Sequence, residues 1–380
     1  MYYNKNMVTG IFGGAFDPPH NEHIKIAKFV LDNYVDKLVF LPSAKPPHKE
    51  CVTDFADRVA MLRIATKDFP QMEISTAESE IEGTNYTYQM LPHLKAKYGE
   101  ILFVIGGDSL IDLRKWKNPF EVIKMCKLCV FNRGDRQEEF DMALKYWREM
   151  GAKIILSDYC PNDISSTCIR YNIECGKMND IPQSVANYIC ENGLYRRFAT
   201  IVDKLKQNVE AGTFEHIVRT AKCALYLNDV CELSLDKDKV FVAALLHDCA
   251  KTICKGEHDS SGVPQDCIGS EIEHQFLGAI LARRDYGVDD DEVLGAIEYH
   301  TTGKEDMSTL EKLILCADML EEKRAFDNID FLRKTIKLDF EIGVYECIAH
   351  QLKYLEQNNK DIYPLTRQAM DYLRREKWKI

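Results

Sequence analysis

Residues 7–31 read MVTGIFGGAFDPPHNEHIKIAKFVL, and the order of residue types in this stretch decides the fold of the first half of the chain. The apolar run at 7–12 predicts a buried strand, and the periodic apolar residues of 24–31 predict a helix. Between them, Gly13 and Gly14 allow the backbone to approach a ligand closely. A helix start offers free N–H groups and a positive dipole end to phosphate. The stretch therefore predicts a strand–loop–helix unit that binds an anion.

The rest of the first half alternates short apolar runs with segments of helical period. Near-continuous apolar strands separated by helices are typical of a parallel sheet that is covered on both faces. Such a sheet binds ligands beyond the carboxyl ends of its strands, which places the site after the first strand. Further strands are expected at 37–41, 72–75, 101–105, 127–131 and 153–156, and one clear helix at 54–67.

From about Phe198 the strand-like runs end and long helical patterns follow. Gly212, Gly287 and the loop 256–269 are expected to separate the helices. We place the boundary at 195–199, which gives an α/β domain over 1–196 and an all-α domain over 197–380. The expected helices of the second domain span 199–210, 215–227, 239–249, 271–284, 292–300, 310–322, 331–357 and 363–376.

The composition limits the partners that this chain can have. Its 380 residues include 60 acidic and 49 basic ones, a net charge of −11, and an acidic chain brings no excess of cations to a nucleic-acid backbone. No stretch reaches the ~20 apolar residues that span a bilayer, and the polar residues 1–6 do not resemble a signal peptide. The 14 scattered cysteines suit a reducing compartment. The spacing of Cys126 and Cys129 is that of a zinc or redox motif, but no second pair follows, so a structural role is expected, with Cys129 in the core. We expect a cytoplasmic protein that binds neither nucleic acid nor membrane; homo-oligomer formation is left open.

A second anion site is expected at 164–170, which reads ISSTCIR and follows an expected strand. Two serine hydroxyls at a helix N-cap and an arginine one turn later suit a phosphate, although a serine-capped helix without a ligand is the alternative. In the entry loop, His20 and His23 are three residues apart, so both rings can face one triphosphate. Trp116 lies on a loop, where it can stack on a planar heterocycle or fill the core.

These segments resemble the nicotinate-nucleotide adenylyltransferases. Residues 13–23 are similar to the entry motif G-G-x-F-D-P-x-H-x-G-H of that family, and residues 164–170 match its I-S-S-T-x-I-R signature. The resemblance covers 7–196 and implies a Rossmann-like nucleotidyltransferase domain that transfers AMP from ATP, with Mg²⁺, to nicotinate mononucleotide. His20 and His23 would be catalytic residues that hold the ATP phosphates. The resemblance implies substrate contacts at Gly13, Gly14, Phe16, Asp17, Lys45, His48, Lys49, Arg58, Tyr86, Thr87, Gly106, Asp108, Trp116, Arg133, Ser165, Ser166 and Arg170.

One position departs from the family pattern, because Glu22 stands where the family has glycine. A carboxylate there either turns outward or crowds the nucleotide, and crowding would leave a domain that binds nucleotide without turnover. Nicotinamide mononucleotide is the alternative acceptor. The transfer needs no general base, because the attacking group is the substrate's own phosphate; the protein must align two polyanions and neutralise their charge.

The second half contains six side chains that can bind metal. His247-Asp248 follows the apolar run 240–246, and Asp318 lies in an otherwise apolar stretch, where an unpaired carboxylate would be costly. Four histidines and two aspartates suffice for two divalent metals with one bridging aspartate. Such a pair hydrolyses phosphoric anhydrides or esters, and mixed imidazole and carboxylate ligands favour iron, with manganese or zinc as alternatives. The expected ligands are His216, His247, Asp248, His274, His300 and Asp318.

The order H…HD…H…H…D resembles the HD-domain phosphohydrolases, and segments 247–251 and 296–303 are similar to the symmetrical bis(5′-nucleosyl)-tetraphosphatases among them. The resemblance covers about 200–380 and implies an all-helical HD domain that cleaves diadenosine tetraphosphate into two ADP. A guanosine alarmone or a nucleoside triphosphate is the alternative substrate. The whole chain thus predicts a bifunctional enzyme of NAD biosynthesis. Asp248 and Lys251 would act in catalysis, and further phosphate contacts are expected from Thr301, Thr302 and Arg324.

Overall fold

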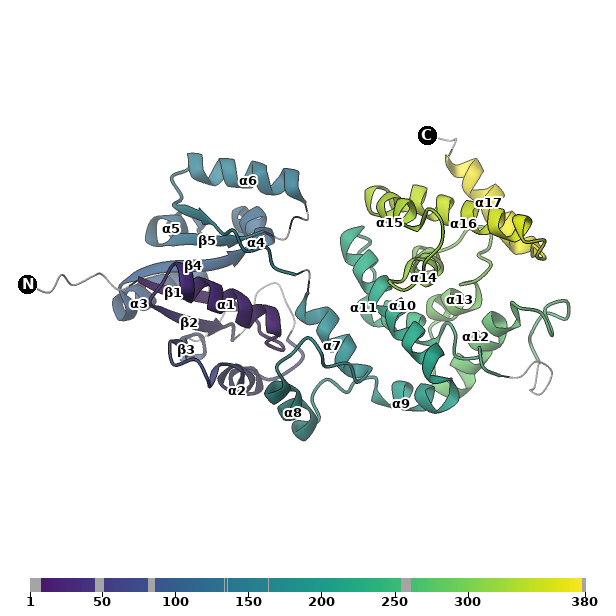
Figure 1. Ribbon diagram of the computed structural model, residues 1–380, viewed down its shortest axis with the longest axis horizontal. Coiled ribbons are helices and arrows are strands. Elements are labelled where there is room, and N and C mark those ends of the chain that lie inside the picture. Colours follow the sequence, from purple (N-terminus) through teal and green to yellow (C-terminus); the bar gives the residue numbers. More distant parts are fainter. Residues whose placement is uncertain are drawn as a thin grey trace, which may run out of the picture. The chain divides into compact units, whose positions relative to one another are not determined.

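The computed structural model describes residues 8–44, 51–80, 86–132, 134, 136–162, 164–253 and 261–377. The chain divides into two compact units, Met1–Arg196 and Arg197–Ile380 (Figure 1). None of the helices within the described ranges combines the length and the apolar character needed to cross a membrane.

A six-stranded parallel sheet forms the centre of the first unit, with the strand order β3-β2-β1-β4-β5-β6. The predicted α/β fold is therefore confirmed. β1 (Val8–Gly14) pairs with β2 (Lys37–Pro42) on one side and with β4 (Glu100–Gly106) on the other. Because the strand order reverses at β1, the loops after β1 and β4 leave the sheet at the same crevice. The outer strands are β3 (Met72–Ile74), β5 (Lys127–Phe131) and β6 (Ile154–Leu156).

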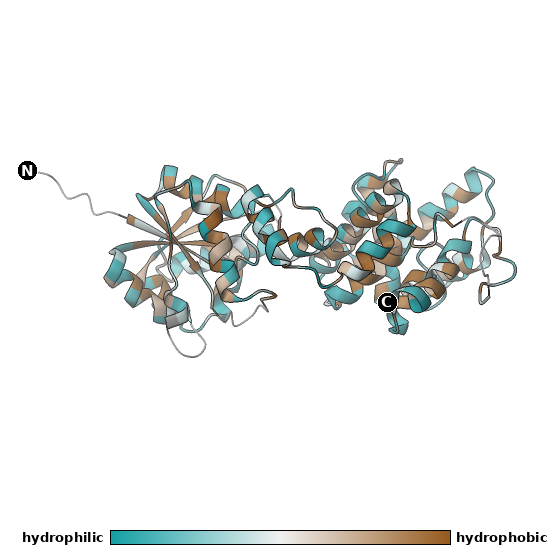
Figure 2. Ribbon diagram, turned by 90° about the horizontal axis from the view of Figure 1, so that it is seen from below, coloured by the Kyte–Doolittle hydropathy of each residue, from teal (hydrophilic) through white to brown (hydrophobic). Residues whose placement is uncertain are grey.

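Helices cover both faces of this sheet, so neighbouring strand residues enter different cores. In β1, Ile11 packs into the core of α3, α5 and α6, whereas Phe12 packs into the core of α1. Figure 2 shows the strands mostly in the colours of hydrophobic residues, lying between helices of mixed character. The apolar strands are continuous because both faces are covered. The helices are α1 (Asn21–Asn33), α2 (Phe55–Thr66), α3 (Thr87–Tyr98), α4 (Gly107–Ile111), α5 (Pro119–Met125) and α6 (Gln137–Glu149), with 3-10 turns η1 (Ala77–Glu80) and η2 (Asp112–Lys115).

Two further helices of the first unit, α7 (Ser166–Glu174) and α8 (Gln183–Asn192), share an apolar cluster with α2. Met61 of α2 lies in this cluster with Ile169 of α7 and Val185 of α8. The packing fixes α7 independently of any ligand, and its first turn therefore has a defined place in the unit.

The described residues of the second unit form helices and no strand, which confirms the predicted all-helical fold. α10 packs against α11 and α14, and α13 packs against α12 and α14. This packing gathers the elements that carry the expected metal ligands around one centre. The helices are α9 (Ala199–Asn208), α10 (Ala211–Val230), α11 (Lys237–Leu246), α12 (Glu273–Tyr286), α13 (Asp291–Glu298), α14 (Thr309–Leu320), α15 (Ile329–Leu338), α16 (Phe340–Gln357) and α17 (Pro364–Lys377).

Two details of the helix prediction are wrong. Gly212 does not separate helices but is the second residue of α10. The segment 331–357 lies in two helices rather than one, because the chain turns at Asp339, whose carboxylate accepts the N–H of Ile342 and caps α16. Gly343 allows the two helices to pack closely, since a Cβ there would lie only 2.4 Å from the backbone of α15.

Candidate active sites

The entry loop after β1 brings two histidine rings together at the start of α1. His20 is the N-cap residue of α1 and is only 2% exposed, and His23 lies in the first turn. The two rings stack with centroids 3.5 Å apart, and the backbone N–H of His20 donates to Nδ1 of His23 over 3.2 Å. Because Nδ1 accepts this bond, neutral His23 carries its proton on Nε2, from which it can donate to a ligand oxygen.

Arg58 and Phe16, two of the expected substrate contacts, are almost completely enclosed by protein. Nη1 of Arg58 donates to the carbonyls of Ala15 and Ser43, over 2.8 and 2.7 Å. The ring of Phe16 lies edge-on to that of Phe12, with centroids 5.6 Å apart. An enclosed side chain can act on a ligand only through the loop that it holds, so we place both residues behind the loop rather than against the substrate.

Asp17 is also buried, and it links the entry loop to the second expected anion site. Its carboxylate accepts the hydroxyls of Thr53 and Tyr195, each over 2.6 Å. Its backbone carbonyl accepts Nη1 of Arg170 over 2.8 Å. Asp17 therefore supports the loop like Arg58, whereas Arg170 keeps part of its side chain exposed beside the loop.

The segment 164–170 opens α7, with Ser165 as its N-cap residue. The hydroxyl oxygen of Ser165 accepts the N–H of Cys168 over 3.2 Å, and the hydroxyl of Ser166 donates to the carbonyl of Pro18 over 3.2 Å. Ser165 caps α7, as both interpretations of this segment require, and the capped start of α7 lies against the entry loop. A polyanion bound there can meet the histidines of α1 and the serines of α7 together.

The other predicted contacts of the first unit lie beyond further strands. Gly107 and Asp108 begin α4 at the end of β4, and Asp108 is exposed. Gly107 must be small, since a Cβ would lie 2.9 Å from the side-chain oxygen of Asn132. Trp116 is half-buried against the core, edge-on to Phe103, so part of its ring stays accessible. Gly106 is the last residue of β4, and α3 begins at Tyr86 and Thr87. Four expected contacts lie outside the described residues: Lys45, His48, Lys49 and Arg133.

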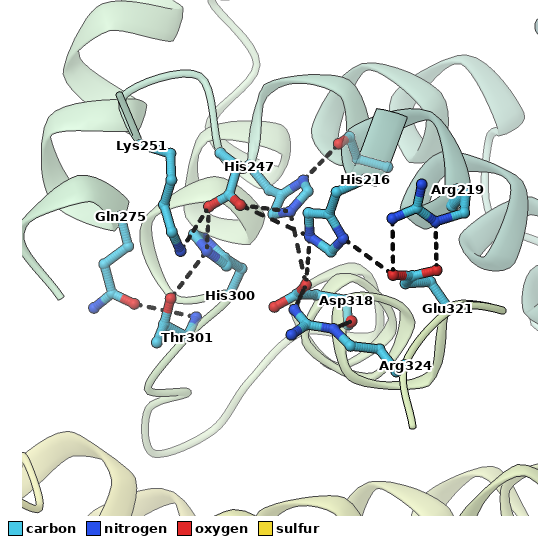
Figure 3. Close-up of polar contacts among 12 residues, drawn as sticks. His216, Arg219, His247, Lys251, Gln275, His300, Thr301, Asp318, Glu321 and Arg324 are labelled. Atoms are coloured by element: carbon cyan, nitrogen blue, oxygen red, sulfur yellow. Dashed lines mark hydrogen bonds and ion pairs between the residues drawn. The ribbon is translucent and has the colours of Figure 1, made fainter. Parts of the chain in front are cut away.

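In the second unit, the carboxylate of Asp248 lies between two pairs of imidazoles. Figure 3 shows three of these imidazoles, those of His216, His247 and His300, gathered at one centre. Its Oδ2 is 3.7 Å from Nε2 of His216 and 3.6 Å from Nε2 of His247. Its Oδ1 is 3.4 Å from Nε2 of His274 and 3.6 Å from Nε2 of His300. Each oxygen with its two imidazoles forms one group that could hold a metal ion, and the two groups share Asp248.

Asp318, from α14, extends the first of these groups. Its Oδ1 is 2.8 Å from Nε2 of His216 and 3.9 Å from Nε2 of His247. The same oxygen accepts Nη2 of Arg324 over 2.7 Å. The structure thus brings all six expected ligands together, with four histidines around one central aspartate and a second aspartate at one end.

The outer nitrogen of every imidazole is held by an oxygen atom of the protein. Nδ1 of His247, His274 and His300 lies 2.7, 2.9 and 2.8 Å from the backbone carbonyl three residues earlier. Nδ1 of His216 lies 3.3 Å from the carboxylate of Glu321. A proton on Nδ1 leaves the lone pair of Nε2 free for a metal, so the four rings are oriented as ligands.

Comparisons with known proteins agree with this division into two chemistries. Residues 11–172 match the cytidylyltransferase-like family model, and residues 213–323 match the HD domain model. A protein of Clostridium tetani named as a probable nicotinate-nucleotide adenylyltransferase is 40% identical over 195 residues, which are 49% of this chain and 98% of that protein. The chain belongs to the nicotinate-nucleotide adenylyltransferase family. Its second half carries an HD domain.

Relatives also cover both halves or the HD domain alone. A Mycoplasma pneumoniae protein named as a probable nicotinate-nucleotide adenylyltransferase/Ap4A hydrolase is 28% identical over 92% of this chain and 100% of its own length. A solved structure from Clostridium acetobutylicum, titled a predicted HD superfamily hydrolase involved in NAD metabolism, is 30% identical with a TM-score of 0.44, covering 47% of this chain and 97% of that one. The expected family is confirmed for the first half, and the expected HD domain is confirmed for the second.

The residues of the HD domain fit divalent metals. Nε2 of His247 is completely buried and has no hydrogen-bond partner among the described residues, which is costly unless a metal binds there. Burial lowers the pKa of His247 to about 4 and that of His274 to about 3, so both rings are neutral ligands at neutral pH. Burial opposes ionisation of Asp248, yet its contacts with His247, His300 and Lys251 hold the pKa of its carboxyl well below the usual value.

Side chains that could contact phosphate surround the metal ligands of the HD domain. Nζ of Lys251 is 3.3 Å from Oδ1 of Asp248, and the hydroxyl of Thr301 is 2.9 Å from Nε2 of His300. Both Lys251 and Arg324 are partly exposed, which leaves room for a substrate. Thr302, in contrast, is buried, so it is placed behind the site rather than against the substrate.

Sequence reasoning assigned no role to three residues that support the HD site. Arg219 binds the carboxylate of Glu321 over 2.7 and 3.2 Å, which orients that carboxylate toward His216. Buried Gln275 accepts the backbone N–H groups of residues 301 and 302 and donates to the hydroxyl of Thr302. The signal that could have found Arg219 is its position three residues after His216, on the same helix face.

Cys126 and Cys129 lie in the two cores on either face of the sheet of the first unit. Cys126 and Cys129 are buried, and burial raises the pKa of each thiol to about 12. Both thiols are free, and the structural role expected of them agrees with this burial.

Proposed function

We propose that the first unit transfers AMP from ATP to nicotinate mononucleotide. A phosphate oxygen of the mononucleotide attacks the α-phosphorus of ATP, and pyrophosphate leaves with the electron pair of the broken P–O bond. The protein aligns the two polyanions and stabilises the charge that develops on the α-phosphoryl and pyrophosphate oxygens. The observation that carries this proposal is the position of the stacked His20 and His23 beside the capped start of α7.

Each group of that site has a distinct part in the proposed reaction. His23 donates from Nε2, and Arg170 supplies a permanent charge beside the entry loop. Ser165 and Ser166 add hydroxyls at the N-terminus of α7, where the helix dipole favours anions. Asp108, in the first turn of α4, and Trp116, directly after η2, are the candidates for contact with the nucleoside and the pyridine ring. Mg²⁺ enters with ATP and offsets part of its charge.

We propose that the second unit hydrolyses diadenosine tetraphosphate symmetrically to two ADP, with two divalent metals, of which iron is the first choice. The observation that carries this proposal is the position of the Asp248 carboxylate, because each of its two oxygens lies beside one pair of imidazoles. When bound, the metal pair supplies a hydroxide at neutral pH and positive charge for the phosphate oxygens. Imidazole and carboxylate ligands suit iron, manganese or zinc.

The surrounding side chains of the HD domain position the tetraphosphate in this proposal. Lys251 is a flexible cation beside the central aspartate and neutralises an oxygen of the phosphate that leaves. Thr301 offers its hydroxyl from the other side of the cluster. Arg324 is paired with Asp318 and can reach a terminal phosphate from the exposed edge of the site.

The test of the second unit is the product pattern of iron-loaded protein given diadenosine tetraphosphate, separated by chromatography. ADP alone is the expected result. ATP plus AMP would refute symmetrical cleavage while keeping the metal chemistry. Absence of product with metal demonstrably bound would refute diadenosine tetraphosphate as the substrate. The same assay with guanosine alarmones would then test whether they are the substrate instead.

The test of the first unit is incubation of the same protein with ATP and either nicotinate or nicotinamide mononucleotide. Formation of deamido-NAD and pyrophosphate with the nicotinate form is the expected result. A clear preference for the nicotinamide form would refute the proposed acceptor. Binding of ATP without any transfer would refute the proposed reaction.

A further inference from the structure

Glu22 is a buried charge in the wall of the transferase site. It lies in the first turn of α1, next to His23, and its side chain is only 1% exposed. The hydroxyl of Tyr159 donates to Oε1, and Nδ2 of Asn162 donates to Oε2 over 3.3 Å. Lys25 adds an ion pair over 3.3 Å. A carboxylate is kept in such a position only when donors compensate its burial, so these contacts define where the side chain points.

The two uncharged donors come from a distant part of the chain. Tyr159 and Asn162 lie between β6 and α7, in the segment that leads to Ser165. The ring of Tyr159 packs beside that of Phe29 on α1, with centroids 5.3 Å apart. The carbonyl of Asn162 accepts the N–H of Ile164 over 2.9 Å, which continues the connection toward α7. Glu22 therefore joins the first turn of α1 to the approach to α7.

The donor role of Tyr159 does not depend on pH in the neutral range. Burial and the bond to Glu22 raise the pKa of the Tyr159 hydroxyl to about 12. The hydroxyl thus stays protonated and continues to donate, and the Glu22 carboxylate stays directed into the protein and away from a triphosphate.

We propose that Glu22 is a positioning residue of the transferase site, which through Tyr159 and Asn162 fixes the start of α7 against the start of α1. The proposal rests on the function proposed for the first unit. Two phosphate-binding elements that belong to different helices act on one triphosphate only while their separation is constant. With glycine at position 22, the two donors would lose their acceptor and the approach to α7 would lose this anchor. The departure from the family pattern is therefore a built-in contact and not an obstruction.

The test measures ATP dissociation constants of the full-length protein by calorimetry, for the wild type and for Glu22→Gly, Glu22→Gln and Tyr159→Phe. Each variant is expected to bind ATP about 10-fold more weakly, the effect of one hydrogen bond to a charged group. The dissociation constant of nicotinate mononucleotide should change less than about twofold, because the contacts proposed for it, Asp108 and Trp116, belong to neither α1 nor α7. A matched control, Asp32→Asn, removes an exposed carboxylate from the same helix and should match the wild type.

A double variant, Glu22→Gly with Tyr159→Phe, separates positioning from general destabilisation. Because Glu22→Gly already removes the acceptor of the Tyr159 hydroxyl, the double variant should bind ATP no more weakly than Glu22→Gly alone. Unchanged ATP binding in the Glu22 variants, or equal weakening for both substrates, would overturn the proposal. Tighter ATP binding and faster turnover in Glu22→Gly would overturn it in favour of crowding by the carboxylate.

The outcomes also separate this inference from the function on which it rests. If the wild type binds ATP but forms no dinucleotide from nicotinate mononucleotide, the proposed reaction is refuted, and the ATP constants still decide the role of Glu22. If Glu22→Gly does not fold, Tyr159→Phe carries the same comparison, because it removes one hydroxyl and no charge.

Discussion

Replacement of Glu321 by glutamine is expected to weaken metal binding at the His216 end of the HD site. Glu321 does not belong to the metal-ligand groups; it is 2% exposed, lies 3.3 Å from Nδ1 of His216 and is held by two contacts from Arg219. Glutamine keeps the size of the side chain but removes the charge that fixes the imidazole proton on Nδ1. Without that charge, the proton can move to Nε2, and the lone pair that a metal needs on Nε2 is then lost.

The size of this effect follows from the contact that is lost. Removal of one oriented partner behind a metal ligand lowers metal affinity by about 10–100-fold, which is about 1.4–2.7 kcal/mol. Only the His216 end should be affected, since the other three imidazoles are oriented by backbone carbonyls that this change does not touch. We therefore expect loss of about one metal per chain at limiting metal, and a matching decrease in hydrolysis.

The assay is competitive metal titration against a chelator, followed by elemental analysis and by hydrolysis of diadenosine tetraphosphate. The chain offers a matched control in Glu322→Gln, which changes the neighbouring residue, an exposed carboxylate paired with Lys222. That control should behave as the wild type, and neither variant should change adenylyl transfer. Equal metal affinity of Glu321→Gln, Glu322→Gln and the wild type would refute the role assigned to the Glu321 carboxylate.

Three further outcomes are expected. Asp248→Asn should remove metal and lower hydrolysis by more than about 100-fold, with adenylyl transfer intact, and loss of both activities would contradict separate active sites. His20→Ala should lower kcat/KM of transfer by about 100-fold without changing hydrolysis, and unchanged transfer kinetics would show that the entry loop does not bind ATP. Glu78 is buried beside Arg58, and burial raises its pKa to about 7 from an ordinary value of 4.5. The folded state therefore binds more protons than the unfolded state between these pH values, so this group makes the protein less stable as pH rises from about 4.5 to about 7. Glu78→Gln should remove that slope and raise stability at pH 7.5 by about 3 kcal/mol relative to the wild type, measured by denaturant unfolding at pH 5 and 7.5; equal slopes would refute it.

The elements that repeat along the chain could be predicted from the sequence. Strands such as 127–131 are visible because both of their faces are buried, which gives a continuous apolar run between polar turns. The helices of the second half are visible through their apolar period, except where the period continues across a turn, as at Asp339. The six metal ligands were found because histidine and aspartate are rare next to buried helices and stand there in the expected order.

The sequence by itself determined which residues are available and in what order: a glycine-rich loop after a strand, a serine-capped helix, and four histidines with two aspartates. Only the tertiary structure decided what each side chain does. It placed Arg58 and Asp17 behind the entry loop, directed Glu22 toward Tyr159, and put Glu321 behind His216. Periodicity reports contacts between residues three or four apart, whereas Glu22 and Tyr159 are separated by 137 positions. Contacts across such separations depend on how the helices and strands pack, and packing is a property of the whole fold.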